Sequence, residues 1–217
     1  MNTEQARFNM IEQQIRPWEV LDSHVLQLLA LIKREDFVLP QHKALAFVDM
    51  ELPIGQGQVM LAPKVEARML QDLAVQRHEK VLEIGAGSGY MAALLAHRAR
   101  EVLTLEIHQP LVQMAQRNLA QAGLHNVEVR HADGASGSAA DGPFDVIVLS
   151  GSVTQIPASL LAQLKVGGRL MAIVGAGVSM QATLVTRTSP SSTHSSTPWD
   201  TVAAPLVNFS QPSRFVF

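Results

Sequence analysis

The sequence contains no cysteine, and this absence removes several kinds of chemistry at once. Without thiols the chain has no disulfide framework, no thiolate metal site and no cysteine nucleophile. Aromatic residues are also scarce, at 5% of 217 residues. Hydrophobic residues nevertheless make up 47% of the chain, which argues against a disordered or fibrous protein. We expect one globular domain that is stabilised by the packing of aliphatic side chains.

Neither an excess of one charge nor a long apolar run is present. Lys and Arg number 17 and Asp and Glu number 19, so the formal net charge is −2. This balance argues against nucleic acid or an anionic membrane as a partner. No window approaches the roughly 18 to 20 apolar residues of a membrane helix, and residues 1–16 carry Glu4 and Glu12 in place of a signal-peptide pattern. We therefore expect a cytoplasmic protein, and a monomer by default.

The middle of the chain, residues 80–175, alternates short apolar runs with longer helical patterns. The expected strands are Val81–Ile84, Val102–Glu106, Val127–Arg130, Asp145–Leu149 and Arg169–Val174. The expected helices between them are at about residues 88–98, 109–122 and 156–164. This alternation is typical of βαβ units. It predicts an α/β fold with a doubly wound, mostly parallel sheet.

The two flanking parts, residues 1–79 and 176–217, have different patterns. In the first part, residues 21–34 predict a helix that Asp22 caps, and Pro63 begins another helix that runs to about residue 74. Residues 37–63 between them are rich in proline and glycine and predict an irregular segment. In the second part, the Ser/Thr-rich residues 186–198 predict a mobile connecting loop. Residues 202–209 and 214–217 then predict antiparallel edge strands.

The strongest functional signal is the segment Glu83-Ile84-Gly85-Ala86-Gly87-Ser88-Gly89, between a predicted strand and a predicted helix. Glycines there allow a tight turn and let a ligand approach the backbone, while the first amides of the helix can donate to anionic groups. A dinucleotide fingerprint would have its third glycine at position 90, which is Tyr90. The loop therefore argues against NAD or FAD. A purely structural turn remains the alternative.

Polar residues also follow the next predicted strands. Glu106 ends the second strand, Asp133 and Gly134 follow the third, and Ser150-Gly151-Ser152 follows the fourth. Ligands of open α/β sheets bind beyond the carboxyl ends of the strands, so one ligand can contact all of these residues. A carboxylate at Glu106 suits the two hydroxyls of a ribose, and Asp133 suits an adenine amine. The alternatives are a helix-capping acid and an ordinary Asp-Gly turn.

With these residues the chain resembles the S-adenosylmethionine-dependent methyltransferases of the Rossmann-like class. More narrowly, it resembles the protein-L-isoaspartate O-methyltransferase family. The resemblance covers most of the chain and rests on residues 10–17, 34–40, 46–49, 52–58, 81–90, 126–134, 143–145 and 163–168. The glycine loop is shared by many methyltransferases, whereas Leu52-Pro53-Ile54-Gly55-Gln56-Gly57-Gln58 is much more specific.

The resemblance implies the cofactor S-adenosyl-L-methionine, its product S-adenosyl-L-homocysteine and the residues that hold them. The implied cofactor-binding residues are Glu83, Gly85, Gly87, Ser88 and Gly89 for the methionine part, Glu106 and Ile107 around the ribose, and Asp133 and Gly134 for the adenine. The implied substrate-cleft residues are Ile54, Gly55, Gln58, Val59, Met60, Leu61, Ser150 and Ser152. The implied activity is methyl esterification of L-isoaspartyl carboxylates in damaged proteins or peptides, a repair reaction in which the ester decays through a succinimide.

One departure from the family pattern concerns the cleft. The usual G-Q-T-I-S-x-P reads Gly57-Gln58-Val59-Met60-Leu61-Ala62-Pro63. Val59 therefore replaces a threonine, and Leu61 replaces a serine to which the family assigns a catalytic, substrate-orienting role, so both hydroxyls are absent. Losing a hydrogen bond to a charged group costs about 1.5–3 kcal/mol, or roughly 10- to 150-fold in rate or affinity. Either backbone amides replace the hydroxyls, or the cleft takes a more apolar acceptor.

The remaining candidates for chemistry are few. The eight histidines lack the spacing of metal ligands, so we expect no metal site. A carboxylate acceptor is already ionised at neutral pH and needs no general base. This agrees with the motifs, which contain no convincing pair of a nucleophile and a general base. Two alternatives stay open: a methyltransferase for a small or apolar acceptor, and a non-catalytic scaffold that binds the cofactor.

Overall fold

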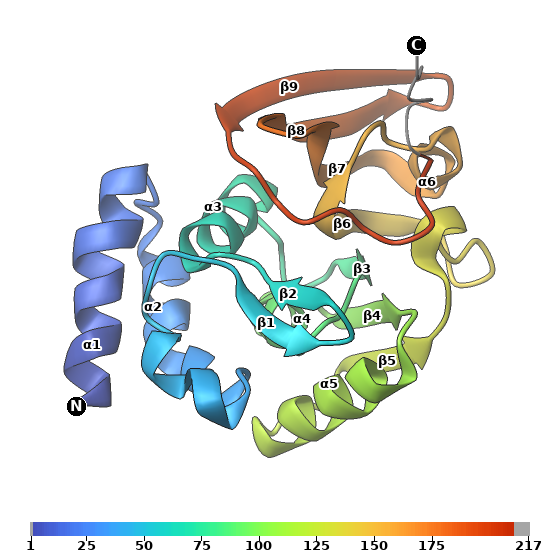
Figure 1. Ribbon diagram of the computed structural model, residues 1–217. Helices are drawn as coiled ribbons and strands as arrows, with labels where there is room; N and C mark the ends of the chain where they lie inside the picture. Colours follow the sequence, from blue (N-terminus) through green and yellow to red (C-terminus); the bar gives the residue numbers. More distant parts are fainter. Residues whose placement is uncertain (1, 211–217) are drawn as a thin grey trace, which may run out of the picture.

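Aliphatic runs of the middle of the chain form the centre of a seven-stranded sheet. The computed structural model describes residues 2–210. The strands are β3 (Lys80–Ile84), β4 (Glu101–Glu106), β5 (Val127–His131), β6 (Phe144–Val153), β7 (Leu164–Ala176), β8 (Ser179–Ser189) and β9 (Ser192–Asp200). Their order is β5-β4-β3-β6-β7-β8-β9, parallel from β5 to β7 and antiparallel beyond it (Figure 1). The predicted doubly wound sheet is confirmed, and each of its five predicted strands is present.

The side chains of the central strands alternate between two apolar layers. Val81, Val102 and Val146 point into the layer that contains α3 (Pro63–Leu73), α4 (Tyr90–Ala96) and α5 (Gln109–Gln121). Leu82, Leu103 and Ile147 point into the opposite layer, which contains α6 (Ala158–Ala162) and Phe209. Both faces of the sheet are therefore covered, as parallel sheets require. The chain order reverses between β4 and β6 on either side of β3, so the carboxyl end of β3 is the switch point of the sheet.

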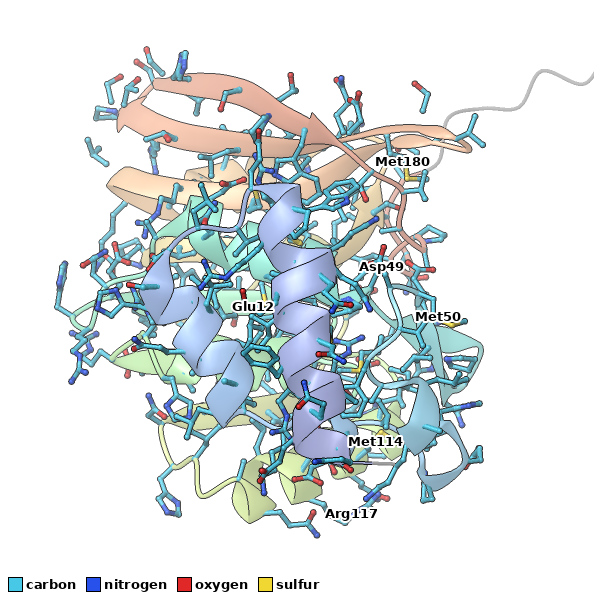
Figure 2. The ribbon with its side chains drawn as sticks, turned by 90° about the vertical axis from the view of Figure 1, so that its left-hand side faces the viewer. Glu12, Asp49, Met50, Met114, Arg117 and Met180 are labelled. Atoms are coloured by element: carbon cyan, nitrogen blue, oxygen red, sulfur yellow. The ribbon has the colours of Figure 1, made fainter. Side chains whose placement is uncertain are left out.

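The N-terminal part adds a further helical layer beside α3. It consists of α1 (Thr3–Met10), which continues through a π-helical turn (Ile11–Ile15) and a 3-10 turn (Arg16–Trp18), and of α2 (Ser23–Leu31). Figure 2 looks onto α1 and α2 from that side. The predicted cap of α2 is present, because Asp22 Oδ1 accepts from the amide of His24 at 2.8 Å. Two further 3-10 turns follow, Arg34–Asp36 and Pro40–Leu45.

The prediction of irregular structure over residues 37–63 is wrong for its second half. Strands β1 (Leu52–Gly55) and β2 (Gln58–Met60) form a small antiparallel hairpin there. Gln56 and Gly57 both have positive φ, at 56° and 70°, which suits the tight turn between two twisted strands. Strands of four and three residues are too short to produce a detectable alternation of polar and apolar side chains.

The Ser/Thr-rich residues 186–198 do not form the predicted mobile loop. They belong to the hairpin of β8 and β9 at the edge of the main sheet, with Thr186 opposite His194. Arg187 anchors this hairpin by donating to the carbonyls of Ala162 and Leu164 at 2.9 and 2.6 Å. An edge strand needs backbone hydrogen bonds on one side only, so exposed Ser and Thr side chains are compatible with it. Low apolar content was therefore a misleading signal.

The predicted edge strand at residues 202–209 is also absent. This segment forms a single parallel bridge, between Ser152 and Pro205, and crosses the carboxyl ends of the strands. The antiparallel strands expected at this end of the fold are instead β8 and β9. The other predicted edge strand, 214–217, lies outside the described residues. Within residues 2–210, no helix is both long and apolar enough to span a bilayer.

Candidate active site

The glycine loop connects β3 to α4 at the switch point of the sheet. Gly85, Gly87 and Gly89 have φ values of 91°, 53° and 88°, which other residues rarely adopt. The amide of Gly85 donates to Leu105 O at 2.9 Å and so attaches the loop to β4. A Cβ atom on Gly89 would come within 3.2 Å of Ala115 Cα. The loop therefore requires glycine for its backbone conformation and, at Gly89, for close packing on α5.

Glu106, at the end of β4, is buried and points at this loop. One carboxylate oxygen accepts from the amide of Gly87 and the other from the amide of His108, both at 2.9 Å. Each oxygen keeps a second lone pair, which can accept from hydroxyl groups of a ligand. His108 Nε2 is buried and has no hydrogen-bond partner within residues 2–210. Both residues line one narrow cavity, so this cavity combines unused acceptor sites with an unpaired ring nitrogen.

Asp133 and Gly134 lie on the same cavity, after β5. Asp133 Oδ1 accepts from the amide of Ala135 at 2.9 Å, which caps a short turn, and Oδ2 accepts from Asn208 Nδ2 at 2.8 Å. A Cβ atom on Gly134 would collide with the side chain of Ile84. Both predicted residues are therefore at the expected strand end, and Asp133 has a partner that the sequence did not indicate.

The C-terminal segment 203–209 forms the outer wall of this cavity. Leu206 and Phe209 line it together with Gln58 and Ile107. Leu206 Cδ2 lies 2.8 Å from the position that a Cβ atom on Gly85 would take. Ser152 holds the segment in place: its amide donates to Ala204 O and its hydroxyl donates to Ala203 O, each at 2.8 Å. Ser152, a predicted cleft residue, thus contacts the wall and not the cleft itself.

Glu83 is the buried acid directly before the loop. Thr104 Oγ1 donates to it at 2.6 Å and Ser150 Oγ donates at 2.7 Å. Burial, with smaller contributions from the nearby Glu66 and Glu106, raises the pKa of Glu83 to about 8 despite these two hydrogen bonds. At neutral pH the carboxyl group therefore holds a proton. The predicted cleft residue Ser150 serves here as a partner of Glu83.

The hairpin of β1 and β2 covers the loop from the other side. Ile54 Cδ1 lies 3.0 Å from the position that a Cβ atom on Gly87 would take. Val59, Met60 and Leu61 line a small cavity together with Glu83 and the residues Gly85 to Ser88 of the loop. The structure therefore brings the predicted cleft residues Val59 to Leu61 together with the predicted cofactor residues of the loop. The wall of this cavity is apolar at positions 59 and 61, where the family pattern that the chain resembles has threonine and serine.

A buried arginine fixes the backbone of the cleft, and sequence reasoning did not identify it as a functional residue. Arg34 Nη2 donates to Leu61 O at 2.6 Å, Nε donates to Ala46 O at 3.1 Å, and Nη1 pairs with Glu66. The guanidinium carbon also lies 5.1 Å from the ring centroid of Tyr90. Burial raises the pKa of Glu66 to about 7, although the charge of Arg34 lowers it. No local signal marks this pair, because the two residues are 32 positions apart.

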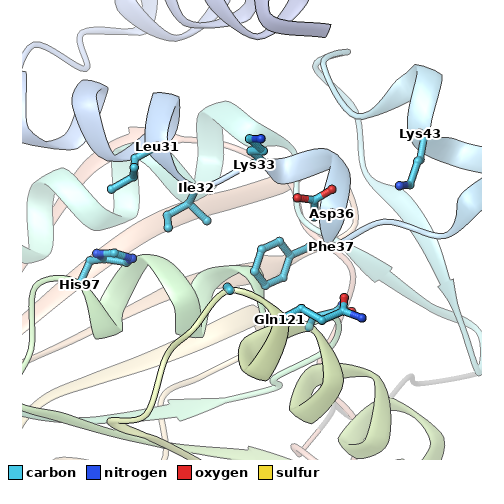
Figure 3. A pocket seen from close by; sticks show the side chains of 10 residues that line it. Leu31, Ile32, Lys33, Asp36, Phe37, Lys43, His97 and Gln121 are labelled. Carbon is cyan, nitrogen blue, oxygen red and sulfur yellow. The ribbon is translucent and has the colours of Figure 1, made fainter.

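A separate hollow of about 340 Å³ lies behind the loop, between α2, α4 and α5 (Figure 3). Phe37 stands in it and packs edge-on against Tyr90, with ring centroids 5.4 Å apart. Asn118, also in its lining, donates to Ser88 O at 2.9 Å. These contacts support the loop from behind. Within residues 2–210 no three histidine or acidic side chains gather into a metal-binding group.

Comparison with known proteins matches most of this chain to one family. Residues 5–210 match the family described as Protein-L-isoaspartate(D-aspartate) O-methyltransferase (PCMT). A protein-L-isoaspartate O-methyltransferase of Koribacter versatilis is 40% identical over 181 residues, which are 83% of this chain and 81% of that protein. Protein-L-isoaspartate O-methyltransferase 1 of Rhodopseudomonas palustris is 43% identical over 184 residues, 84% of this chain and 75% of that protein.

A solved structure supports the fold. A Plasmodium falciparum protein assigned as a protein-L-isoaspartate O-methyltransferase, in complex with S-adenosyl-L-homocysteine, superposes with a TM-score of 0.80. The superposition covers 95% of this chain and 98% of that one, at 18% sequence identity. At this identity the likeness establishes the architecture of the chain and not its ligand.

Proposed function

This chain belongs to the protein-L-isoaspartate O-methyltransferase family, and we propose that it methylates the carboxylate of L-isoaspartyl residues in damaged proteins or peptides. The observation that carries this proposal is the convergence of the glycine loop, Glu106 and Asp133 with the β1-β2 hairpin at the carboxyl ends of the parallel strands. We further propose that the protein acts as a cytoplasmic monomer, without nucleic-acid or membrane partners.

The residues at the strand ends fit S-adenosyl-L-methionine. His108, whose Nε2 has no hydrogen-bond partner within residues 2–210, and Glu106, which keeps free lone pairs, line one cavity, and an adenosine group carries both donors and acceptors for them. We propose that Glu83, Gly85, Gly87, Ser88 and Gly89 hold the methionine part, Glu106 and Ile107 the ribose, and Asp133 and Gly134 the adenine. When bound, this cofactor supplies an electrophilic methyl group on a sulfonium sulfur.

The chemistry asks little of acid or base residues. An isoaspartyl carboxylate has a pKa near 4 and is ionised at neutral pH, so it is already nucleophilic. The main tasks of the protein are to align the acceptor and to exclude water. Met60 and Leu61 are buried and line the small cavity next to the loop, where they exclude water. Arg34 fixes the position of that backbone through Leu61 O.

A second candidate function follows from the same cavity. Val59 and Leu61 offer no hydroxyl to an acceptor carboxylate, whereas they pack well against an apolar acceptor. A methyltransferase for a small, apolar acceptor is therefore the alternative. A non-catalytic scaffold that binds the cofactor is the second alternative.

Transfer of labelled methyl groups separates these functions. The test uses a short isoaspartyl peptide, its aspartyl twin as the control, and base-labile release of methanol as the readout of a methyl ester. We expect label in the isoaspartyl peptide only. If neither peptide is labelled while calorimetry shows cofactor binding, the repair function is wrong. Turnover of a small apolar acceptor would then identify the alternative enzyme, and the absence of any turnover would favour the scaffold.

A further inference from the structure

A groove lies outside the candidate active site, along residues 49–51, 62–65 and 200–202. Its volume is about 570 Å³, and Trp18, Val178 and Met180 complete its lining. We infer that this flanking groove holds the stretch of polypeptide beside the methyl-accepting residue, and that it favours substrates with a lysine or arginine there. The inference rests on the proposed function, because only a polypeptide acceptor has such a stretch.

The flanking groove borders the cleft at residues 61 and 62. Ala62 lines the groove, while the preceding residue, Leu61, lines the cavity at the glycine loop. The amide of Ala204 donates to Glu51 Oε1 at 3.0 Å. Glu51 itself lines the groove. A chain with one side chain at the glycine loop therefore has neighbouring residues within reach of the groove.

The rim of the groove exposes aliphatic side chains to solvent. Val178 is 96% exposed, Val202 is 55% exposed and Met50 is 41% exposed. Asp49, Met50 and Met180 lie along the same side of the molecule (Figure 2). These side chains come from three separate segments that converge on one hollow. Such a convergence suits the apolar parts of a polypeptide.

The charges of the groove determine the preferred partner. Asp49, Glu51 and Asp200 oppose a single cation, Lys64. Lys64 is already engaged, because Nζ lies 2.6 Å from Asp49 Oδ2 and 3.9 Å from the ring centroid of Trp18. Three carboxylates against one ammonium leave an excess of two negative charges. A basic side chain of the substrate complements this excess, and an acidic one is repelled.

Peptides of matched sequence test the inference. Three isoaspartyl peptides differ only in their flanking residues, which are lysine, glutamine or glutamate. Methyl transfer gives kcat and KM for each, and the anisotropy of fluorophore-labelled peptides gives binding without turnover. We expect the lysine peptide to have a KM and a dissociation constant about two- to fivefold below those of the glutamate peptide. The difference should shrink as salt is added.

Two variants locate the effect in the groove. Asp200→Lys should abolish or invert the preference for lysine, and Val178→Lys should weaken it by adding a positive charge to the groove. Val178 is exposed enough to be replaced without affecting folding. Glu4→Lys is the matched control: it makes the same charge change on exposed α1 and should leave the preference intact.

The outcomes separate the inference from the proposed function. Methylation of all three peptides with equal KM would overturn the flanking groove and leave the repair function standing. A preference that persists in both groove variants would also overturn it. If no peptide is methylated, the repair function fails, and the anisotropy measurement alone decides whether the groove selects basic peptides.

Discussion

Replacing Arg34 by methionine tests whether a buried cation positions the cleft. The guanidinium donates to Leu61 O and Ala46 O and pairs with Glu66, so one side chain joins the cleft segment, the preceding loop and α3. Methionine fills a similar volume and makes none of these bonds. The variant therefore removes the polar contacts while it keeps most of the packing.

The expected loss is large because Glu66 stays buried without its partner. Breaking a buried ion pair on one side costs about 3–5 kcal/mol of unfolding free energy. The cost should depend on pH. The pKa of Glu66 is about 7 in the folded chain, against its ordinary value of 4.5. The contribution of this residue to the free energy of unfolding is therefore full below pH 4.5 and is lost as the pH rises through 7. Without Arg34 the folded pKa rises further, and the penalty should therefore grow above pH 7.

Urea unfolding at pH 6 and pH 8.5 measures this penalty. The double variant Arg34→Met with Glu66→Gln should recover part of the loss, since the unpaired charge is gone. A control is Arg7→Met, which breaks the buried Arg7–Glu35 pair and should lower stability without changing the peptide KM of the folded protein. A loss below about 1 kcal/mol for Arg34→Met, or one that does not change with pH, would refute the reasoning.

Three further changes have defined outcomes. Asp133→Ala should weaken S-adenosyl-L-homocysteine binding about tenfold in calorimetry, as expected for a lost hydrogen bond, whereas Asn208→Ala, which breaks the same Asp133–Asn208 bond, should not. Leu61→Ser should leave cofactor affinity nearly unchanged and raise kcat/KM on isoaspartyl peptides if the missing hydroxyl limits the rate. The pKa of Glu83 is raised from 4.5 to about 8, so the free energy of unfolding should fall as the pH rises from 4.5 to 8. Glu83→Gln should remove that fall in urea titrations from pH 5 to 9.

The parallel core could be predicted because its signals are local. Strands β3, β4, β6 and β7 each contain an aliphatic run, and glycines or polar residues mark where strands end and helices begin, as at Gly85. Edge elements lack such signals. The strand β9 is stabilised by backbone bonds to β8, and eight of its nine side chains, all but Trp199, are exposed. Composition therefore predicted a loop where pairing with a neighbour determines a strand.

The candidate site divides in the same way. Glu106 and Asp133 could be predicted because strand ends in a parallel sheet meet at one edge. Arg34, Leu206 and Asn208 could not, because each reaches the site from a distant part of the chain. Asn208 contacts a residue 75 positions away, and only the tertiary fold brings the two together.

The apolar cleft changes what must orient the acceptor. A serine in place of Leu61 would hold a carboxylate through its side chain, whereas here the fixed feature at this position is the backbone, held by Arg34 through Leu61 O. A fixed backbone presents its amide groups at defined positions without the entropy cost of ordering a side chain. Methyl transfer to an ionised carboxylate needs alignment and no proton transfer, so such positioning suffices in principle. We therefore expect activity despite Leu61 to depend on this backbone, which Arg34 holds through Leu61 O while it pairs with Glu66.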